Sequence, residues 1–504
     1  MNGHLFGPAI ATRRTLTRNI AWNFFGLTAP LLAALVAVPR LLAGLGTERF
    51  ALLALAWALL GYFTLFDVGL GRALTQSVSV RLGAGGVEEV PKVVWSSLLL
   101  LLVVGALGAA CLDAVRAPAL AAMKSIPPDL RPEAMTCYRL LAATVPILTL
   151  TAGIRGILEA YQEFALLSTV RVAAGILMFA APLPLMTGPR PLLATVVILC
   201  VLRLSMLVVF AAYCIRLSPE LWRRRTVATA AAIQVLRLGG WMTVSNIVSP
   251  LMTYLDRFII GAILSVSAVT FYATSQEIAT RLILVPSAIV GVLFPAFGRT
   301  LTVDQPKARN MYRLSMTTTI AFLFPVALLL ILFSRELLTF WLGSSFAAQS
   351  CRSFQILVLG VLITGPAMVA FALLQAAGRP DLTAIFHLAE LPVYLAGAFC
   401  LIKLFGLTGA AVASVGRIAL DALLLFWAAK RVAGVSRGVA AQAALAVVLA
   451  AGAVSLDYLN AGLVMKCLSL AVLTVPAAHF GRLVLRQRTA EAAAGRAVPC
   501  YEPL

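Results

Sequence analysis

Residues 192–215 read LLATVVILCVLRLSMLVVFAAYCI, and Arg203 is the one charged residue among them. A transmembrane helix needs about 20 consecutive, mainly apolar residues to cross the hydrocarbon core of a bilayer. This stretch exceeds that length and contains no proline or glycine. It therefore predicts a membrane-spanning helix that carries a charge near its middle.

The composition extends this prediction to the whole chain. Of the 504 residues, 61% are hydrophobic and 12% are charged. The hydrophobic residues suffice for about fourteen or fifteen spans. A soluble domain carries about 25% charged residues, so the composition excludes a soluble enzyme.

We predict an all-α polytopic membrane protein with about 14 transmembrane helices. The longest loop, at residues 114–137, is too small to form a catalytic domain. The apolar runs that define the helices lie at residues 19–43, 49–71, 93–115, 138–160, 164–186, 192–215, 232–262, 268–298, 312–334, 353–377, 382–403, 406–430, 438–456 and 461–483.

The runs are organised as two pseudo-symmetric lobes of six helices and a C-terminal helix pair. A Gly-Arg pair ends the second span of each block, at residues 71–72 and 298–299. Duplicated halves around a central cavity are a common transporter plan. The predicted segments are an N-terminal segment (1–18), the N-lobe (19–215), an Arg-rich linker (216–231), the C-lobe (232–430), the helix pair (438–483) and a tail (484–504).

The net charge of +20 reflects topology. In a polar protein this value would suggest nucleic-acid binding. In a membrane protein, however, Lys and Arg collect in the cytoplasmic loops. The basic clusters here lie mostly on the side of the N-terminus. We therefore predict that both termini are cytoplasmic and that nucleic acid is not a partner.

The cysteines and histidines give no sign of a metal site. The eight cysteines form no C-x-x-C pair, and the three histidines are far apart in the sequence. Metal sites usually show closely spaced ligands of these types. The sequence therefore predicts neither a metal site nor a cofactor.

Charges inside the predicted spans are the candidate functional residues, because a charge at the bilayer centre costs about 2.5 kcal/mol or more. Glu277 and Arg281 are spaced i, i+4, so they share one face of a helix. Asp256 and Arg257 are neighbours in sequence, so their side chains point in different directions around their helix. Either could reach the next span.

The same spacing recurs in later spans. Arg417 and Asp421 are spaced i, i+4, and His387 and Glu390 share a face at i, i+3. For each pair, a structural salt bridge and a ligand site are both open interpretations. Arg203 has no acidic residue within four positions. It needs a partner from another helix, a water-filled cavity or an anionic ligand.

Charges near the inner ends of spans are less informative, because long side chains can extend to the interface there. The pairs Arg155/Glu159 and Asp67/Arg72 belong to this class. Deep arginines are suited to bind phosphate or diphosphate through paired hydrogen bonds. The acidic residues within spans could instead titrate or hold a cation.

Several sequence stretches resemble one family of transporters. They include YLDRFIIGAILSVSAVTFYA (254–273), LLQAAGRPDLTAIFHLAELPVYLAGAFCLIKLFGLTGAAVAS (373–414) and GIRGILEAYQEF (153–164). Over about residues 15–430 the chain resembles the polysaccharide transporter family, which includes the O-antigen flippases. This family is part of the multidrug/oligosaccharidyl-lipid/polysaccharide exporter superfamily.

The resemblance implies a flippase of the bacterial inner membrane, not an enzyme. It would move a polyprenyl-diphosphate-linked oligosaccharide between leaflets by alternating access, for surface polysaccharide biosynthesis. Partners would be the lipid-linked glycan, membrane lipids and polysaccharide assembly proteins, with H⁺ or Na⁺ coupling open. A drug/cation antiporter of the superfamily and a polytopic glycan polymerase or ligase are the alternatives.

The resemblance also favours a basic cavity lined by the first two helices of each lobe. The substrate-binding candidates are Arg40, Arg72, Arg203, Arg257 and Arg281. The candidates for ion coupling or charge balance are Asp67, Asp256, Glu277 and Glu390.

Overall fold

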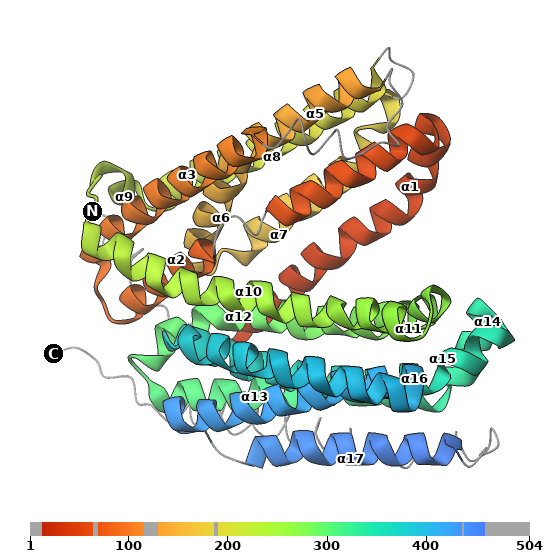
Figure 1. Cartoon of the computed structure of the whole chain (residues 1–504). Helices are drawn as coiled ribbons and strands as arrows, with labels where there is room; N and C mark the ends of the chain where they lie inside the picture. Colours follow the sequence, from red (N-terminus) through yellow and green to blue (C-terminus); the bar gives the residue numbers. More distant parts are fainter. Residues whose placement is uncertain (1–12, 64–68, 115–129, 186–189, 436–437, 459–504) are drawn as a thin grey trace. The chain divides into compact units, whose positions relative to one another are not determined.

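The computed structural model describes residues 13–63, 69–114, 130–185, 190–435 and 438–458. Every regular element in these ranges is helical, which confirms the all-α class (Figure 1). Eight helices or helix runs among them are long and apolar enough to cross a membrane. The count of about 14 spans stays a prediction, and the run at 461–483 lies outside the described residues.

The chain divides into two compact units. The N-terminal unit comprises residues 1–246 and 291–303, and the C-terminal unit comprises residues 247–290 and 304–504. Of the three boundaries, two fall inside helices, in α10 (Thr229–Ile263) and α12 (Leu284–Leu301), and the third follows α12. The predicted division into lobes at the 216–231 linker is not tested by these units and stays a prediction.

The remaining helices of the N-terminal unit follow the predicted spans with shifted ends. The helix at 131–143 begins seven residues before the start of the predicted span 138–160. That span is divided at Thr144 between two consecutive helices. The elements are α1 (Arg13–Phe63), α2 (Leu70–Gly83), α3 (Val90–Ala114), α5 (Arg131–Ala143), α6 (Val145–Ala160), α7 (Phe164–Ala180), α8 (Pro191–Leu217) and α9 (Pro219–Arg223), with short 3₁₀ turns η2 (Val87–Glu89) and η3 (Leu183–Leu185).

The C-terminal unit contains the remaining helices. They are α11 (Val266–Thr280), the 3₁₀ turn η4 (Arg281–Ile283), α13 (Gln305–Leu332), α14 (Ser334–Leu342), α15 (Ser344–Ala376), α16 (Pro380–Ala433) and α17 (Gly438–Tyr458). Helix α15 packs against α16, α13 and α11. It therefore forms the centre of this unit.

The first two predicted spans need correction. Helix α1 runs from Arg13 to Phe63 through the predicted break at 44–48. The predicted second span ended at Gly71-Arg72, but these residues lie in the first turn of α2. Most of α2 is buried, with Leu70, Ala73 and Leu74 fully inaccessible. A polar-looking segment thus forms a packed helix, because its small and hydroxylated side chains allow neighbouring helices to approach closely.

Glycines make two of these close approaches possible. At Gly69, which precedes α2 with φ 64°, a β-carbon would lie 2.7 Å from the carbonyl oxygen of Gly239 on α10. At Gly156 on α6, a β-carbon would lie 2.7 Å from the carbonyl oxygen of Gly71. Helix α2 is therefore held between α6 and the first part of α10.

The Arg-rich linker is bound to α3. The indole Nε1 of Trp95 donates to the carbonyl of Leu221 at 3.0 Å, and Arg225 lies 5.5 Å from the centre of the Trp95 ring. Trp95 also packs edge-on against Trp222. These contacts fix a basic segment at one end of the N-terminal unit.

Helix α16 contains a break at Gly406. This residue has φ 58° and ψ −135°, a region that essentially only glycine adopts. The apolar pattern predicts two spans here, 382–403 and 406–430, and the break at Gly406 confirms their boundary. The two halves bring His387 and Asp421 together, as described below.

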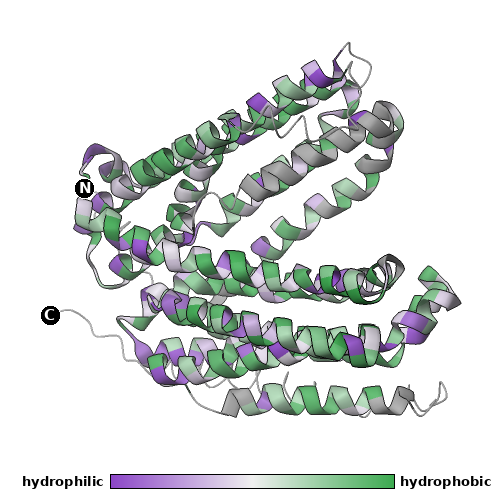
Figure 2. Ribbon diagram, in the orientation of Figure 1, coloured by the Kyte–Doolittle hydropathy of each residue, from purple (hydrophilic) through white to green (hydrophobic). Residues whose placement is uncertain are grey.

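Apolar residues predominate along many of the helices (Figure 2), and many large apolar side chains are exposed. Leu107 on α3 and Val208 on α8 are 65% and 57% exposed. Soluble monomers rarely expose large continuous apolar surfaces. With the long apolar helices, this surface identifies a multi-pass membrane protein.

We predict that Gly69→Ala destabilises the N-terminal unit. A residue with a β-carbon pays about 1–2 kcal/mol in the left-handed conformation, and the new methyl group would also collide with Gly239. The measurement is thermal unfolding of the purified protein in detergent, and Tm should fall. Gly240→Ala is the matched control, because no atom lies within 4 Å of its β-carbon position. Equal Tm values for the two variants would contradict the packing described here.

Candidate functional site

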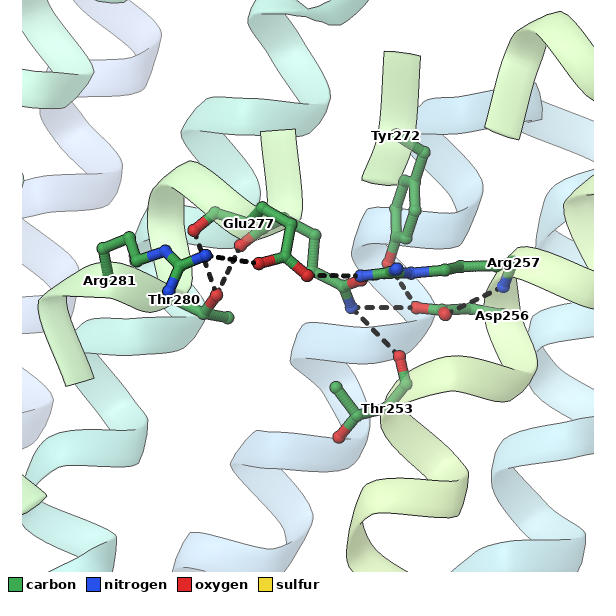
Figure 3. A network of polar contacts seen from close by, with 8 residues as sticks. Thr253, Asp256, Arg257, Tyr272, Glu277, Thr280 and Arg281 are labelled. Carbon is green, nitrogen blue, oxygen red and sulfur yellow. Dashed lines mark hydrogen bonds and ion pairs between the residues drawn. The ribbon is translucent and has the colours of Figure 1, made fainter. Parts of the chain in front are cut away.

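A polar network joins the end of α10 to α11 within the C-terminal unit (Figure 3). Its buried centre is Asp256, which has no exposed surface. The hydroxyl of Tyr272 donates to Asp256 Oδ2 at 2.7 Å, and Gln276 Nε2 donates to the same oxygen at 3.3 Å. The backbone amide of Arg257 donates to Asp256 Oδ1 at 2.9 Å. The buried carboxylate is therefore fully provided with donors.

Arg257 extends this network toward the surface. Its Nε and Nη2 donate to Gln276 Oε1 at 3.2 and 3.0 Å, and Nη2 also donates to Glu277 Oε1 at 3.1 Å. Its guanidinium lies 4.9 Å from the centre of the Tyr254 ring. Asp256 and Arg257 both reach the next predicted span, although they point in different directions from α10.

Glu277 holds two arginines at once. Its Oε2 is 3.1 Å from Arg281 Nη2, while Oε1 binds Arg257. The side chains of Glu277 and Arg281 are 47% and 71% exposed. The predicted i, i+4 pair is thus formed, although Arg281 lies in the 3₁₀ turn η4 after α11 ends. Two carboxylates balance two arginines, so the network is neutral overall.

A second polar cluster lies between the two halves of α16. His387, Glu390 and Tyr394 come from the first half and are each at most 4% exposed. Asp421 comes from the second half, and its Oδ1 is 3.6 Å from His387 Nε2. The ion pair between Arg417 and Asp421 that their i, i+4 spacing suggested is not formed. Arg417 instead lies 5.6 Å from the centre of the Tyr394 ring.

This second cluster is poorly supplied with hydrogen bonds. Both carboxylate oxygens of Glu390 are buried without a partner, and so is the hydroxyl of Tyr394. The same holds for His387 Nδ1 and Arg417 Nε. A buried charged group without hydrogen bonds is costly. The cluster therefore suits a group that changes its charge or binds an ion.

Arg417 links the two clusters electrostatically. Its charge acts on Asp256 in the first cluster and on Glu390 and Asp421 in the second. The two clusters thus form a set of acidic and basic groups on α10, α11 and α16 of the C-terminal unit.

The other predicted residues are not part of this set. Arg40 on α1 and Arg72 on α2 are exposed, and Asp67 lies outside the described residues. Arg203 lies in the middle of α8 and lines two cavities in the N-terminal unit. The predicted Arg155–Glu159 pair is formed, at 3.4 Å.

Sequence reasoning missed Arg171. This residue lies at the middle of α7, inside the predicted span 164–186, and it lines both of those cavities. Its position within an apolar run was the signal that could have identified it. Tyr272 and Gln276 are also absent from the residues predicted from the sequence, because their uncharged side chains carry no such signal.

Within the described residues, no group of three His, Cys, Asp or Glu side chains could hold a metal ion.

Comparison with known proteins gives two kinds of match. The family model described as “Polysaccharide biosynthesis protein” matches residues 16–301. A Shigella flexneri protein named “Putative O-antigen transporter” is 30% identical over 424 residues, which are 84% of this chain and 99% of that protein.

Solved structures show the same fold. A mutant of the Vibrio cholerae MATE transporter VcmN matches with a TM-score of 0.69 and 16% identity, covering 84% of this chain and 97% of that one. An outward-facing multidrug resistance MATE family transporter of the MOP superfamily matches with a TM-score of 0.69 and 17% identity, covering 85% and 97%. The fold is thus that of the MATE transporters.

We predict that Tyr272→Phe lowers stability, because it removes the shortest hydrogen bond to a fully buried carboxylate. Leaving a buried acceptor short of one donor costs about 1–3 kcal/mol, measurable as a lower Tm in detergent. Tyr254→Phe on α10 is the control, since Tyr254 is 50% exposed and should be tolerated.

A double-mutant cycle with Asp256→Asn tests the contact itself. If Tyr272 acts through Asp256, the two changes together should cost less than their sum. Strict additivity would mean that the two groups do not depend on each other.

Proposed function

The chain belongs to the polysaccharide biosynthesis protein family, and on this premise we propose that it is a lipid-linked oligosaccharide flippase. Its substrate would be a polyprenyl-diphosphate-linked oligosaccharide, moved across the bacterial inner membrane by alternating access for surface polysaccharide biosynthesis. The observation that carries this proposal is the 30% identity to the Shigella protein over 84% of the chain. Both termini would then be cytoplasmic, and polysaccharide assembly proteins would be partners.

The charges inside the helices support an anionic substrate over a cationic drug. A drug/cation antiporter would be expected to present a mainly acidic site. Here the network on α10 and α11 is balanced, and Arg171 and Arg203 line cavities in the N-terminal unit that have no acidic lining residue. A polymerase or ligase would be an enzyme, whereas the fold and the named relatives are those of transporters.

We propose that Arg257 and Arg281 contact the diphosphate. Arginine binds phosphate oxygens through two parallel hydrogen bonds. Glu277 holds both guanidinium groups in the absence of substrate, so a diphosphate would replace one carboxylate with a group of higher charge. Arg40, Arg72 and Arg203 are the further substrate-binding candidates, and Asp67 remains a candidate for charge balance.

We propose that the acidic groups of α16 couple transport to protons. Glu390 is buried with two unpartnered oxygens, and Asp421 on the second half of α16 lies 3.6 Å from His387 on the first half. A proton can neutralise such a carboxylate without needing several ligands. A Na⁺ gradient is the alternative, since a single carboxylate with carbonyl or hydroxyl oxygens can also hold Na⁺. Asp256 would take part through its electrostatic link to Arg417.

The experiment that tests the substrate uses a strain lacking the native gene. The unmodified protein should restore surface polysaccharide, while the double variant Arg257→Gln/Arg281→Gln should lower flipping about tenfold or more. Loss of one charge-assisted hydrogen bond costs about 1.5–3 kcal/mol, which corresponds to that factor or above. The measurement is the fraction of lipid-linked oligosaccharide that stays at the inner leaflet.

Arg379→Gln is the control, because Arg379 pairs with Asp381 at the exposed start of α16. It should flip as well as the unmodified protein. Normal flipping by the double variant would refute the assignment of the two arginines. No accumulation of lipid-linked oligosaccharide in the deletion strain would refute the function.

The coupling ion is tested in proteoliposomes with an imposed pH gradient or Na⁺ gradient. Flipping by the unmodified protein should respond to the pH gradient, and Glu390→Gln should remove that response by fixing a neutral side chain. Glu336→Gln changes an exposed carboxylate on α14 and should leave the response intact. A response to Na⁺ alone would exclude proton coupling.

A further inference from the structure

Two adjoining cavities lie inside the N-terminal unit, among α1, α6, α7 and α8. Their volumes are about 100 and 220 Å³, and they share the lining residues Arg171, Arg203 and Met206. A buried water needs only about 10–15 Å³ by the same measure. The space is thus large enough for a small polar group as well as for water.

The three arginines around the first cavity differ in the partners of their guanidinium groups. Arg155 pairs with Glu159 at 3.4 Å, and Arg171 Nη1 donates to the amide oxygen of Asn23 at 2.9 Å. Arg203 has neither a hydrogen bond nor an ion pair with any residue that the structure describes. None of the residues lining either cavity is acidic. The cavity therefore holds more positive charge than its surroundings compensate.

Burying the charge of Arg203 in the middle of a membrane-spanning helix is energetically costly. Arg203 occupies the middle of α8, and the walls around it include Leu167, Met206 and Phe210. Desolvation of an arginine among such groups must be offset by water or by an opposite charge. Arg155 repels Arg171 electrostatically, and Glu159 attracts it. Glu159 is already engaged by Arg155, so it is not available to Arg203.

We propose that this cavity binds a phosphate or diphosphate group, with Arg203 and Arg171 as its ligands and Arg155 at its edge. The planar fork of each guanidinium matches the oxygens of a phosphate. An anion there would neutralise Arg203 and relieve the repulsion among the three arginines. The proposal deepens the proposed function and rests on it for the lipid carrier, since a prenyl diphosphate and a free diphosphate present the same chemistry to the site.

The test measures binding to the purified full-length protein in detergent. The probes are inorganic pyrophosphate, farnesyl diphosphate and farnesol, which lacks the anion. Farnesyl diphosphate should bind and farnesol should not. Arg203→Gln and Arg171→Gln should each weaken farnesyl diphosphate binding about tenfold or more. Arg203→Lys, which keeps the charge but loses the fork, should weaken it less.

Arg216→Gln is the matched control, because Arg216 is an exposed arginine at the end of the same helix. It should bind like the unmodified protein. Thermal unfolding without ligand checks folding, and removal of the uncompensated charge in Arg203→Gln should leave Tm unchanged or raise it.

Inorganic pyrophosphate and farnesyl diphosphate distinguish a free anion from a lipid-anchored one. Binding of both, weakened by the same variants, assigns the site to the diphosphate itself. Binding of farnesyl diphosphate alone assigns it to a lipid-anchored diphosphate. Failure of farnesyl diphosphate to bind, or equal binding to Arg203→Gln, would overturn the proposal. Normal binding by a protein that restores no flipping would instead refute the proposed function and leave this site intact.

Discussion

A charged side chain buried in an apolar bundle must be paired, hydrated or neutral, since its desolvation costs several kcal/mol. The C-terminal unit meets this constraint at Asp256, which is fully buried. The donors that satisfy it come from α11, through Tyr272 and Gln276, and from the amide of Arg257. The same bonds join α10 to α11. Arg257 and Glu277 then connect this buried carboxylate to the exposed Arg281, so one buried charge determines how the surrounding side chains are arranged.

The carboxylates in the cluster between the two halves of α16 are less completely hydrogen-bonded. Glu390 has burial comparable to that of Asp256 but no hydrogen bond to either oxygen. A fully satisfied network holds one arrangement, whereas a partly satisfied one is costly and is sensitive to a change of charge. The break at Gly406 places this second cluster where the two halves of one long helix meet. A change of charge at Glu390 or Asp421 would thus act directly on the packing of the two halves.

Local features of the sequence could predict much of the fold but only part of the site. The span of α8, the break at Gly406 and the Glu277–Arg281 pair all depend on residues within a few positions of each other. Predictions failed where partners are far apart in the sequence. Asp421 faces His387 and not Arg417, and the donors to Asp256 are the uncharged Tyr272 and Gln276. Helix α2 was missed because its burial arises from close contacts of Gly69 and Gly156, which carry no periodic apolar signal.

The two groups of arginines differ in what an anion must displace. Glu277 already binds both Arg257 and Arg281, so an incoming phosphate at those residues competes with a carboxylate that is held at 3.1 Å from each. Arg203 presents no such competitor within the described residues, and the walls of its cavity are mainly apolar. An interaction between charges is stronger where water is scarce. The desolvation cost of the anion rises in the same surroundings, so what distinguishes the proposed site at Arg203 is that no carboxylate competes with the anion there. In the proposed flippase, Glu277 would help to displace a phosphate from Arg257 and Arg281, and such displacement would be needed because tight capture without release would stop the cycle.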